Sequence, residues 1–335
     1  MPAHPLLHWH TATLCAQLAP LLPGLRVQAV AEINSTNSAL LARARGGDGQ
    51  PADALPCLLV AEHQNAGRGR QGKAWQSAAG ASLTFSLALP LAPVDWSGLS
   101  LAVGLALAET LDPPQPGQPA AVGIKWPNDL LLRDAPAGGP HGGGVIGRKL
   151  GGILIETVQI GSQRLAVVGV GLNLRPLPVL PTDAPPLSWG HASLQELPAL
   201  RAGSNGPLTA PQALARVALP LVQALLAFER GGFAPLQQRF ATRDLLAGHA
   251  VQTTLPELPQ GIADGVDATG TLWLRVPQGG ENGGTNGGTN GGTNGGTNGD
   301  RAAPALRWPV RSGEVSLRQA APDNTTAAVT RACAC

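Results

Sequence analysis

The chain alternates short apolar runs with polar connections rich in glycine and proline. Six of these runs have the length and composition of buried β-strands, at residues 25–33, 57–62, 81–89, 122–126, 150–157 and 165–173. Apolar residues recur at helical spacing over 97–111 and 211–230, and Ser35, Thr36 and Asn37 offer capping side chains to a third helix that stops at Gly46. This alternation predicts an α+β fold built on a mixed β-sheet.

The pattern changes near residue 245, where short strands and turns replace the long apolar runs. We expect strands at 251–255, 261–266, 271–276 and 315–318, with a turn at 267–270. These strands predict a small β-barrel domain over 245–320, after a large domain over 25–244. Residues 1–24 are then an N-terminal extension and residues 321–335 a tail.

A tandem Gly-Gly-Thr-Asn tract interrupts the predicted small domain. It is too polar and too rich in glycine to bury anything, so we expect residues 282–299 to be disordered. The flanks around Trp273 and Trp308 can still pair as a hairpin, because each doubling of a flexible loop costs only about 0.6 kcal/mol. Residues 135–147 are predicted to be a similar glycine-rich surface insertion, between two strands.

The composition excludes several classes of protein. A chain of 335 residues, 43% hydrophobic and 13% charged, should fold as one large and one smaller domain. The formal charge of +2 and the scattered basic residues lack the footprint of a nucleic-acid binder, and no apolar run reaches the roughly 18 residues of a membrane span. No signal peptide is apparent, so we expect a cytoplasmic protein that binds neither DNA nor membranes.

The four cysteines do not form a metal-binding pattern. Cys15 and Cys57 stand alone, and Cys333 and Cys335 lie in the polar tail without a second pair or a nearby histidine. We expect reduced thiols.

The first candidate site is the basic loop Gly67-Arg68-Gly69-Arg70-Gln71-Gly72-Lys73. Its glycines let the backbone approach an anionic ligand while the guanidinium groups neutralise that ligand. Taken alone, such a turn is more often a solvated loop, and it matches neither the P-loop nor the dinucleotide-binding pattern. The chain has 20 arginines but only three lysines, Lys73, Lys125 and Lys149, each in a glycine- or turn-rich motif. A compact ammonium suits a point contact with a carboxylate or phosphate, although chance is the alternative explanation.

Two further motifs can contribute polar groups. Lys125-Trp126-Pro127-Asn128-Asp129 places an amide and a carboxylate at a turn after a strand, where they could hold Mg²⁺ and phosphate. In isolation this motif is an ordinary turn. In the strand Val168–Asn173, glycines let a ligand or another backbone come close, and Asn173 can hydrogen-bond a base or a phosphate.

Taken together and in order, five segments resemble the bacterial biotin protein ligase family. They are E-I-N-S-T-N at 32–37, A-E-H-Q-N-A-G-R-G-R-Q-G-K-A-W at 61–75, K-W-P-N-D at 125–129, K-L-G-G-I-L-I-E at 149–156 and G-V-G-L-N at 169–173. The likeness covers 25–173 well and the C-terminal region more loosely, where 313–318 look like the family's closing strand. It implies a catalytic domain of the biotin/lipoate ligase type followed by an SH3-like barrel.

The resemblance also implies an activity. Members of the family use ATP and Mg²⁺ to convert biotin to biotinyl-5'-AMP, and then transfer biotin to a lysine of the biotin carboxyl carrier protein of acetyl-CoA carboxylase or a related carboxylase. By their places in the motifs, the implied biotin-binding residues are Ser35, Thr36, Asn37, Gln64, Arg68, Gly69, Arg70, Lys149 and Gly152. The implied ATP- and adenylate-binding residues are Trp75, Lys125, Asn128, Asp129 and Asn173. Lys149 and Arg70 would be catalytic, and Asp129 would hold Mg²⁺.

Two departures from the family pattern bear on function. About 24 residues precede the first predicted strand, too few for the N-terminal winged helix that lets many relatives bind DNA, so we do not expect a repressor. The insertion at 135–147 directly precedes Lys149 and leaves open how this lysine is presented.

Two other functions remain as alternatives, a lipoate or octanoate protein ligase and a non-catalytic biotin sensor. Ser35, Thr36 and Gln64 suit a urea-like ring better than a fatty acid. The set of lysines with Asn128 and Asp129 favours retained chemistry over a sensor. A biotin carrier is excluded, because its modified lysine resembles A-M-K-M and Met1 is the sole methionine here. Neither the oligomeric state nor the carriers modified can be predicted.

Overall fold

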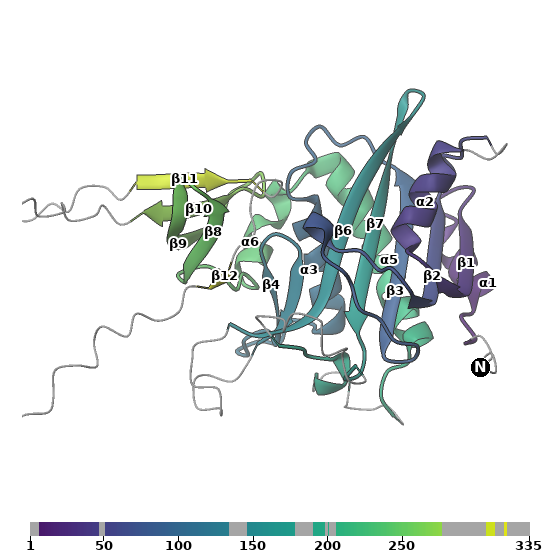
Figure 1. Cartoon of the computed structure of the whole chain (residues 1–335), viewed down its shortest axis with the longest axis horizontal. Helices are drawn as coiled ribbons and strands as arrows, with labels where there is room; N and C mark the ends of the chain where they lie inside the picture. Colours follow the sequence, from purple (N-terminus) through teal and green to yellow (C-terminus); the bar gives the residue numbers. More distant parts are fainter. Residues whose placement is uncertain are drawn as a thin grey trace, which may run out of the picture.

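A seven-stranded mixed sheet forms the body of the larger domain (Figure 1). The computed structural model describes residues 7–46, 51–133, 146–177, 190–197, 200, 206–276, 306–311 and 318–319. Across the sheet, the strands are β1 (Arg26–Ile33), β2 (Cys57–Gln64), β3 (Ser82–Pro90), β7 (Gln163–Asn173), β6 (Arg148–Ile160), β5 (Asp129–Leu132) and β4 (Val122–Lys125). β1 and β2 pair in parallel and the other neighbours are antiparallel, so the sheet is mixed, as predicted.

Helices cover both faces of this sheet, because its central strands are apolar on both sides. Leu58 and Val60 of β2 belong to the main core, which also contains α3 (Leu99–Leu111) and α5 (Ala210–Gly231). The alternate residues Cys57 and Leu59 pack instead with α2 (Thr36–Arg45), in a second core on the other face. In Figure 1, α2 accordingly lies in front of the sheet and α5 behind it.

The helix α1 (Thr11–Leu18) was not predicted from the sequence. Leu14 and Leu18 are buried, as is Trp9 just before the helix, and all three belong to the main core. The helix has only eight residues and is followed by prolines, so its apolar spacing is too short to be recognised in the sequence.

Among the described residues, α5 is the one helix long and apolar enough to span a membrane. Thr209 and Gln212 form a capping box at its start, and nine of its residues are buried inside the protein. Burial within the main core therefore explains the apolar composition of α5. Shorter helical turns complete the domain: η1 (Arg70–Gly72), η2 (Leu194–Glu196), η3 (Ala234–Leu236) and α6 (Gln237–Ala241).

The C-terminal region is a five-stranded antiparallel sheet. Its order is β11 (Leu306–Val310), β10 (Leu272–Val276), β9 (Leu258–Val266), β8 (Ala250–Leu255) and β12 (Arg318–Gln319). The predicted hairpin is confirmed, because Trp273 lies opposite Pro309 and Leu274 opposite Trp308. β11 and β12 are the two edge strands and do not pair with each other within the described residues, so the predicted barrel is not confirmed.

Three predictions fall wholly or largely outside the described residues. These concern the glycine-rich insertion at 135–147, the Gly-Gly-Thr-Asn tract and most of the strand predicted at 315–318.

The turn between β9 and β10 joins the small sheet to the large domain. Asp267 shapes this turn by accepting hydrogen bonds from the backbone of Thr269 and Thr271. The Gly270 carbonyl accepts a hydrogen bond from Nε1 of the fully buried Trp126 at 3.1 Å. A Cβ built on Gly270 would lie 2.5 Å from the Cα of Gly98, so only glycine allows this approach.

Candidate active site

A cavity of about 210 Å³ lies between the start of α2, the loop after β2, and the strands β3, β5, β6 and β7. Its lining brings together motifs that are far apart in the sequence. The predicted site residues in the lining are Ser35, Thr36, Asn37, Gln64, Arg68, Gly69, Arg70, Trp75, Lys125, Asn128, Asp129, Lys149 and Gly152. Asn173 is the predicted site residue that does not line it.

The polar floor of the cavity is a connected network at the start of α2. Ser35 is extended and caps the helix by accepting a hydrogen bond from the Ser38 amide, which turns Thr36 and Asn37 into the cavity. Gln64 Oε1 accepts a hydrogen bond from the Thr36 amide at 2.7 Å. Because that bond fixes the oxygen of the Gln64 amide, its NH₂ group remains as a donor for a ligand.

Ser86 extends this network and was not predicted as a site residue. Its hydroxyl lies 2.7 Å from Thr36 Oγ1 and donates to Asn37 Oδ1 at 2.6 Å. The side chain is fully buried and lines the cavity from β3. Ser86 could not be recognised from the sequence, because a serine in an apolar strand belongs to no motif.

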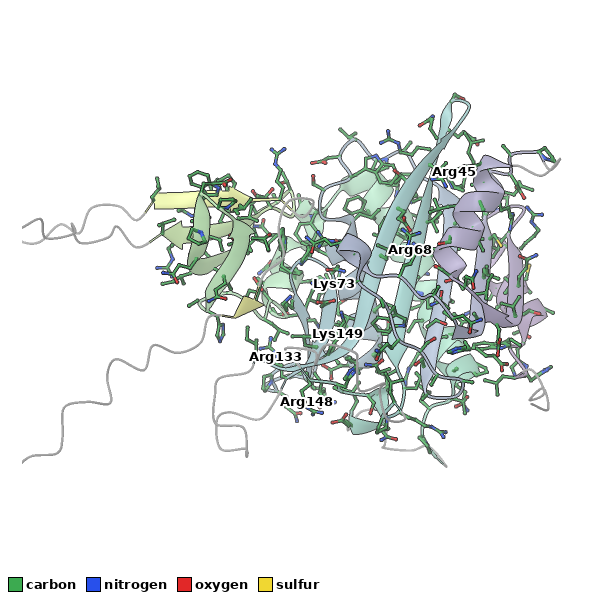
Figure 2. The ribbon with its side chains drawn as sticks, viewed as in Figure 1. Arg45, Arg68, Lys73, Arg133, Arg148 and Lys149 are labelled. Atoms are coloured by element: carbon green, nitrogen blue, oxygen red, sulfur yellow. The ribbon has the colours of Figure 1, made fainter. Side chains whose placement is uncertain are left out.

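The opposite end of the cavity is strongly cationic. Arg70, Lys73, Lys125 and Lys149 line it, with Asp129 as the sole carboxylate among the lining residues of the cavity. Arg68 lines the cavity nearer the floor, where it donates to Ser38 Oγ. In Figure 2, Lys73 and Lys149 lie toward β4, whereas Arg68 lies toward α2. Four cations facing one carboxylate make this end a site for anions.

Asp129 lies between two of these lysines. Its Oδ1 is 2.7 Å from Lys149 Nζ, and its Oδ2 is 3.7 Å from Lys125 Nζ. Burial alone would raise the pKa of Asp129, but Lys149 and Lys125 outweigh it and hold that pKa below its usual range. Burial lowers the pKa of Lys125, and Asp129 opposes this effect.

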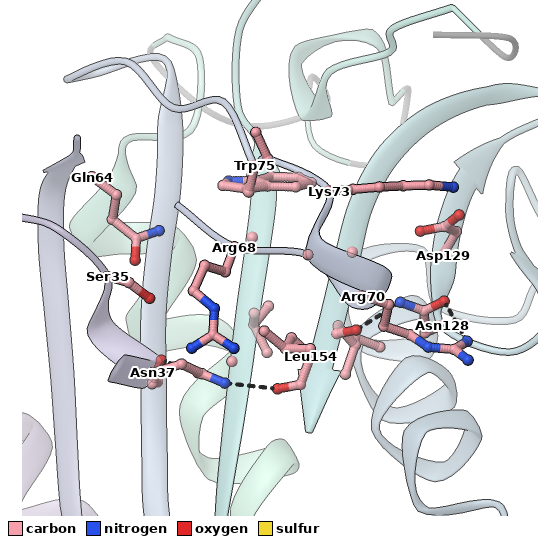
Figure 3. Close-up of a pocket in the computed structure, with 18 of the residues that line it drawn as sticks. Ser35, Asn37, Gln64, Arg68, Arg70, Lys73, Trp75, Asn128, Asp129 and Leu154 are labelled. Carbon is pink, nitrogen blue, oxygen red and sulfur yellow. Dashed lines mark hydrogen bonds between the residues drawn. The ribbon is translucent and has the colours of Figure 1, made fainter. Parts of the chain in front are cut away.

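The basic loop folds over the cavity as a small hairpin. Trp75 N donates to Gly67 O at 2.8 Å and Gly69 N to Lys73 O at 2.7 Å. At the tip, Gln71 and Gly72 have φ values of 54° and 71°, which is the geometry of a tight hairpin turn. Arg70 donates to Asn128 Oδ1 at 3.3 Å, so the loop also contacts the K-W-P-N-D motif (Figure 3).

Trp75 packs flat on the glycines of β6 and β7. A Cβ added to Gly171 would lie 2.3 Å from its indole ring, and one added to Gly152 would lie 3.3 Å from it. Its Nε1 is buried without a hydrogen-bond partner among the described residues. The indole therefore contributes an apolar ring to the lining of the cavity, while its N–H is buried. The sequence indicated this close approach through the glycines of V-G-V-G-L-N, but not that Trp75 fills it.

Asn173 supports the site from behind. Its Nδ2 donates to the carbonyls of Lys149 and Ala192, both at 3.1 Å. The Lys149 amide in turn donates to Gly190 O. Asn173 thus fixes the start of β6 and helps to present Lys149, and its contact with ATP stays a prediction.

A metal ion fits this site only as a companion of a phosphate ligand. No cluster of three or more His, Cys, Asp or Glu side chains exists in the parts of the chain that are described. Mg²⁺ commonly takes one or two carboxylates together with substrate phosphates. Asp129 and the amide oxygen of Asn128 fit that limited role.

Comparison with known proteins agrees with this geometry. Residues 31–173 match the model of the Biotin/lipoate A/B protein ligase family. The chain is 34% identical to the biotin–[acetyl-CoA-carboxylase] ligase of Mycobacterium tuberculosis over 75% of this chain and 84% of that protein. It is also 34% identical to the bifunctional ligase/repressor BirA of Escherichia coli, over 77% and 72%.

A solved structure shows the same fold. The biotin protein ligase of Aquifex aeolicus, in complex with biotin and ATP, superimposes with a TM-score of 0.58 at 21% identity, over 88% of this chain and 99% of that one. The fold, the ordered motifs and the sequence identity to characterised ligases agree, and this chain belongs to the biotin protein ligase family.

Proposed function

We infer that the protein is an ATP-dependent biotin protein ligase. It adenylates biotin to biotinyl-5'-AMP and transfers the biotinyl group to a lysine of a carrier protein. The observation that carries this proposal is the two-ended cavity. A neutral polar floor at Ser35, Thr36 and Gln64 suits a urea-like ring, and the cationic end suits a carboxylate beside phosphates.

The charges of the cavity account for the first step. The biotin carboxylate attacks the α-phosphorus of ATP, and pyrophosphate leaves. Attacking oxygen and phosphate are both anionic, so Lys149 and Arg70 lower the barrier by offsetting their repulsion. Bound with ATP, Mg²⁺ neutralises phosphate charge, and Asp129 with Asn128 would hold it.

The second step requires that the mixed anhydride be kept from water. The amine of a carrier lysine attacks the biotinyl carbonyl, and AMP leaves. The loop over the cavity, with Arg70 bonded to Asn128 and Trp75 packed on β7, excludes water until the carrier arrives.

The remaining assignments are part of the same proposal. Asn37, Arg68, Gly69 and Gly152 surround biotin, and Trp75 and Lys125 contact the adenylate. We propose a catalytic domain over 25–244 and an SH3-like domain over 245–320, in a cytoplasmic enzyme. Its substrates would be biotin carboxyl carrier proteins of acetyl-CoA carboxylase and related carboxylases.

Single-turnover adenylation tests the proposal. Labelled biotin and MgATP should give biotinyl-AMP in wild type, and Lys149→Ala should lower its rate by at least about 100-fold. Arg148→Ala is the matched control, because Arg148 is the neighbour of Lys149 on β6 but pairs with Glu196 at 2.8 Å outside the cavity. Octanoate and lipoate serve as competitors.

Two other outcomes of this experiment would each indicate a different function. Adenylation of only lipoate or octanoate would replace biotin as the substrate. Biotin binding without adenylate would make the protein a sensor.

A further inference from the structure

One carboxylate outside the cavity joins its floor to the loop above it. Glu156 on β6 is partly exposed and does not line the cavity. Its Oε2 accepts a hydrogen bond from Asn37 Nδ2 at 3.0 Å, and its Oε1 pairs with Arg68 Nη2 at 2.8 Å. Asn37 belongs to α2 and Arg68 to the loop, so one side chain holds both elements.

A continuous hydrogen-bonded chain leads from the floor to this carboxylate. Gln64 Oε1 accepts from the Thr36 amide at 2.7 Å. The Thr36 hydroxyl donates to Ser86 Oγ at 2.7 Å, because the single proton of Ser86 is donated to Asn37 Oδ1. Asn37 Nδ2 then donates to Glu156. Hydrogen bonds in such a chain polarise one another, so a ligand that fixes the first groups also fixes the last.

Arg68 is also in direct contact with α2. Arg68 also donates to Ser38 Oγ at 3.0 Å, again on α2. Asn37 packs closely on β7, because its Oδ1 occupies the space that a Cβ on Gly169 would fill. The position of Glu156 is therefore tied to α2, and the position of Arg68 is tied to Glu156.

We propose that Glu156 is a positioning residue that links the polar floor of the cavity to the loop, so that a ligand on the floor favours the closed loop. The proposal rests on the proposed function, since biotin is the ligand of the floor. Linkage makes the effect reciprocal, so a loop that closes less well also binds biotin less tightly.

Amide hydrogen exchange of residues 67–75 tests this link, with and without biotin and in the absence of ATP. In wild type we expect the loop to exchange readily when empty and more slowly with biotin. Glu156→Gln keeps the size of the side chain but removes its charge. It should weaken both the biotin-induced slowing and the biotin affinity, each by about three- to tenfold, as for loss of a charge-assisted hydrogen bond.

The matched control is Glu109→Gln. Glu109 pairs with Arg239 on α6, and that pair is about as exposed as Arg68 and Glu156 but lies outside the cavity. This variant should exchange like wild type. A second variant, Arg68→Ala, breaks the same link from the loop side. Glu156→Gln should then add little to Arg68→Ala, because both remove one interaction.

A further readout separates positioning from stability. Without carrier, Glu156→Gln should release more biotinyl-AMP into solution per turnover than wild type, while its melting temperature stays close to that of Glu109→Gln. Equal biotin-induced slowing in wild type and Glu156→Gln, or additive effects of the two variants, would overturn the link. Failure of wild type to bind biotin would instead overturn the proposed function.

Discussion

Asp129 is the residue on which the charge balance of the cavity depends. It contacts Lys149 and Lys125, and nothing else among the lining residues carries a negative charge. Removing one partner of a buried ion pair costs more than the pair contributes, because the remaining charges stay desolvated. The empty enzyme therefore depends on Asp129 for stability as well as for binding.

We expect Asp129→Asn to lower the free energy of unfolding of the empty protein by about 3 kcal/mol. Asp53→Asn is the control, since Asp53 also pairs with two arginines but is more exposed, so its loss should cost at most about 1 kcal/mol. Thermal denaturation with ATP should narrow the difference between Asp129→Asn and wild type, because phosphates replace the missing negative charge. Equal stability of the two variants would contradict this account.

The same residue predicts how stability depends on pH. The pKa of Asp129 is lower in the folded protein than its ordinary value. Its contribution is therefore present above the unfolded pKa of about 4 and is lost as the pH falls through the lower folded pKa. Denaturation measured from pH 7 to pH 3 should show wild type losing its advantage over Asp129→Asn only below about pH 4. An advantage that disappears near pH 6 would point to a histidine instead.

Gly171 and Gly152 give a graded test of how Trp75 is placed. An added methyl at Gly171 would overlap the indole at 2.3 Å, whereas one at Gly152 would meet it at 3.3 Å. We expect Gly171→Ala to displace Trp75 and raise KM for ATP about tenfold or more, and Gly152→Ala to change it by less than about threefold. Steady-state kinetics with both substrates measure this. A larger effect at Gly152 would show that Trp75 does not pack on β7 during catalysis.

Motif residues were predictable from the sequence to the extent that their chemistry is local. The glycines and cations of 67–73, and the capping role of Ser35, follow from residue type and spacing. Ser86 and Glu156 were not predictable as site residues, because their partners come from elements far away in sequence. Asn173 was placed in the site region correctly, but its amide bonds to backbone carbonyls.

At the scale of elements, long apolar runs predicted six strands of the large sheet, but the strand β5 was missed. β5 has four residues and directly follows a turn motif, so neither its length nor its periodicity distinguishes it. The order of strands was also beyond prediction, since pairing of β3 with β7 joins segments about 80 residues apart. Lys125 on β4 and Lys149 on β6 owe their proximity to the pairing of both strands with β5, the strand that was missed.

Trp126 connects the large domain to the small sheet through a contact that could not be predicted from the sequence. It lies in the K-W-P-N-D motif, and its Nε1 donates to Gly270 in the turn between β9 and β10. We expect Trp126→Phe to cost about 1–3 kcal/mol of stability, from the unpaired carbonyl and the lost volume. It should also raise KM for ATP, because Asn128 and Asp129 follow Trp126 and Pro127 in the same motif and would be displaced with it. KM for biotin should change little.

Trp308→Phe provides the comparison for that variant. Trp308 lies on β11 of the small sheet, opposite Leu274, so its replacement should lower stability without a selective effect on ATP. If both tryptophan variants affect the two substrates equally, the turn is a structural contact and does not position the motif.

At the scale of the whole molecule, the small sheet contains two paired strands, β10 and β11, that are joined by a long connection. Val276 at the end of β10 lies opposite Leu306 at the start of β11, although 29 residues separate them in the sequence. The predicted pairing of these flanks relied on the slow growth of loop-closure entropy with length. The structure confirms the pairing, and the energetic reason can be tested directly.

Replacing residues 277–305 by a four-residue turn shortens the connection by nearly three doublings. If the connection acts as a flexible tether, the protein should gain at most about 2 kcal/mol in free energy of unfolding, with unchanged kinetics for biotin and ATP. Urea denaturation and steady-state adenylation measure the two quantities. A loss of stability would show that the tract contributes contacts of its own. A selective loss of transfer to the carrier, with adenylation intact, would instead assign the tract a part in carrier recognition.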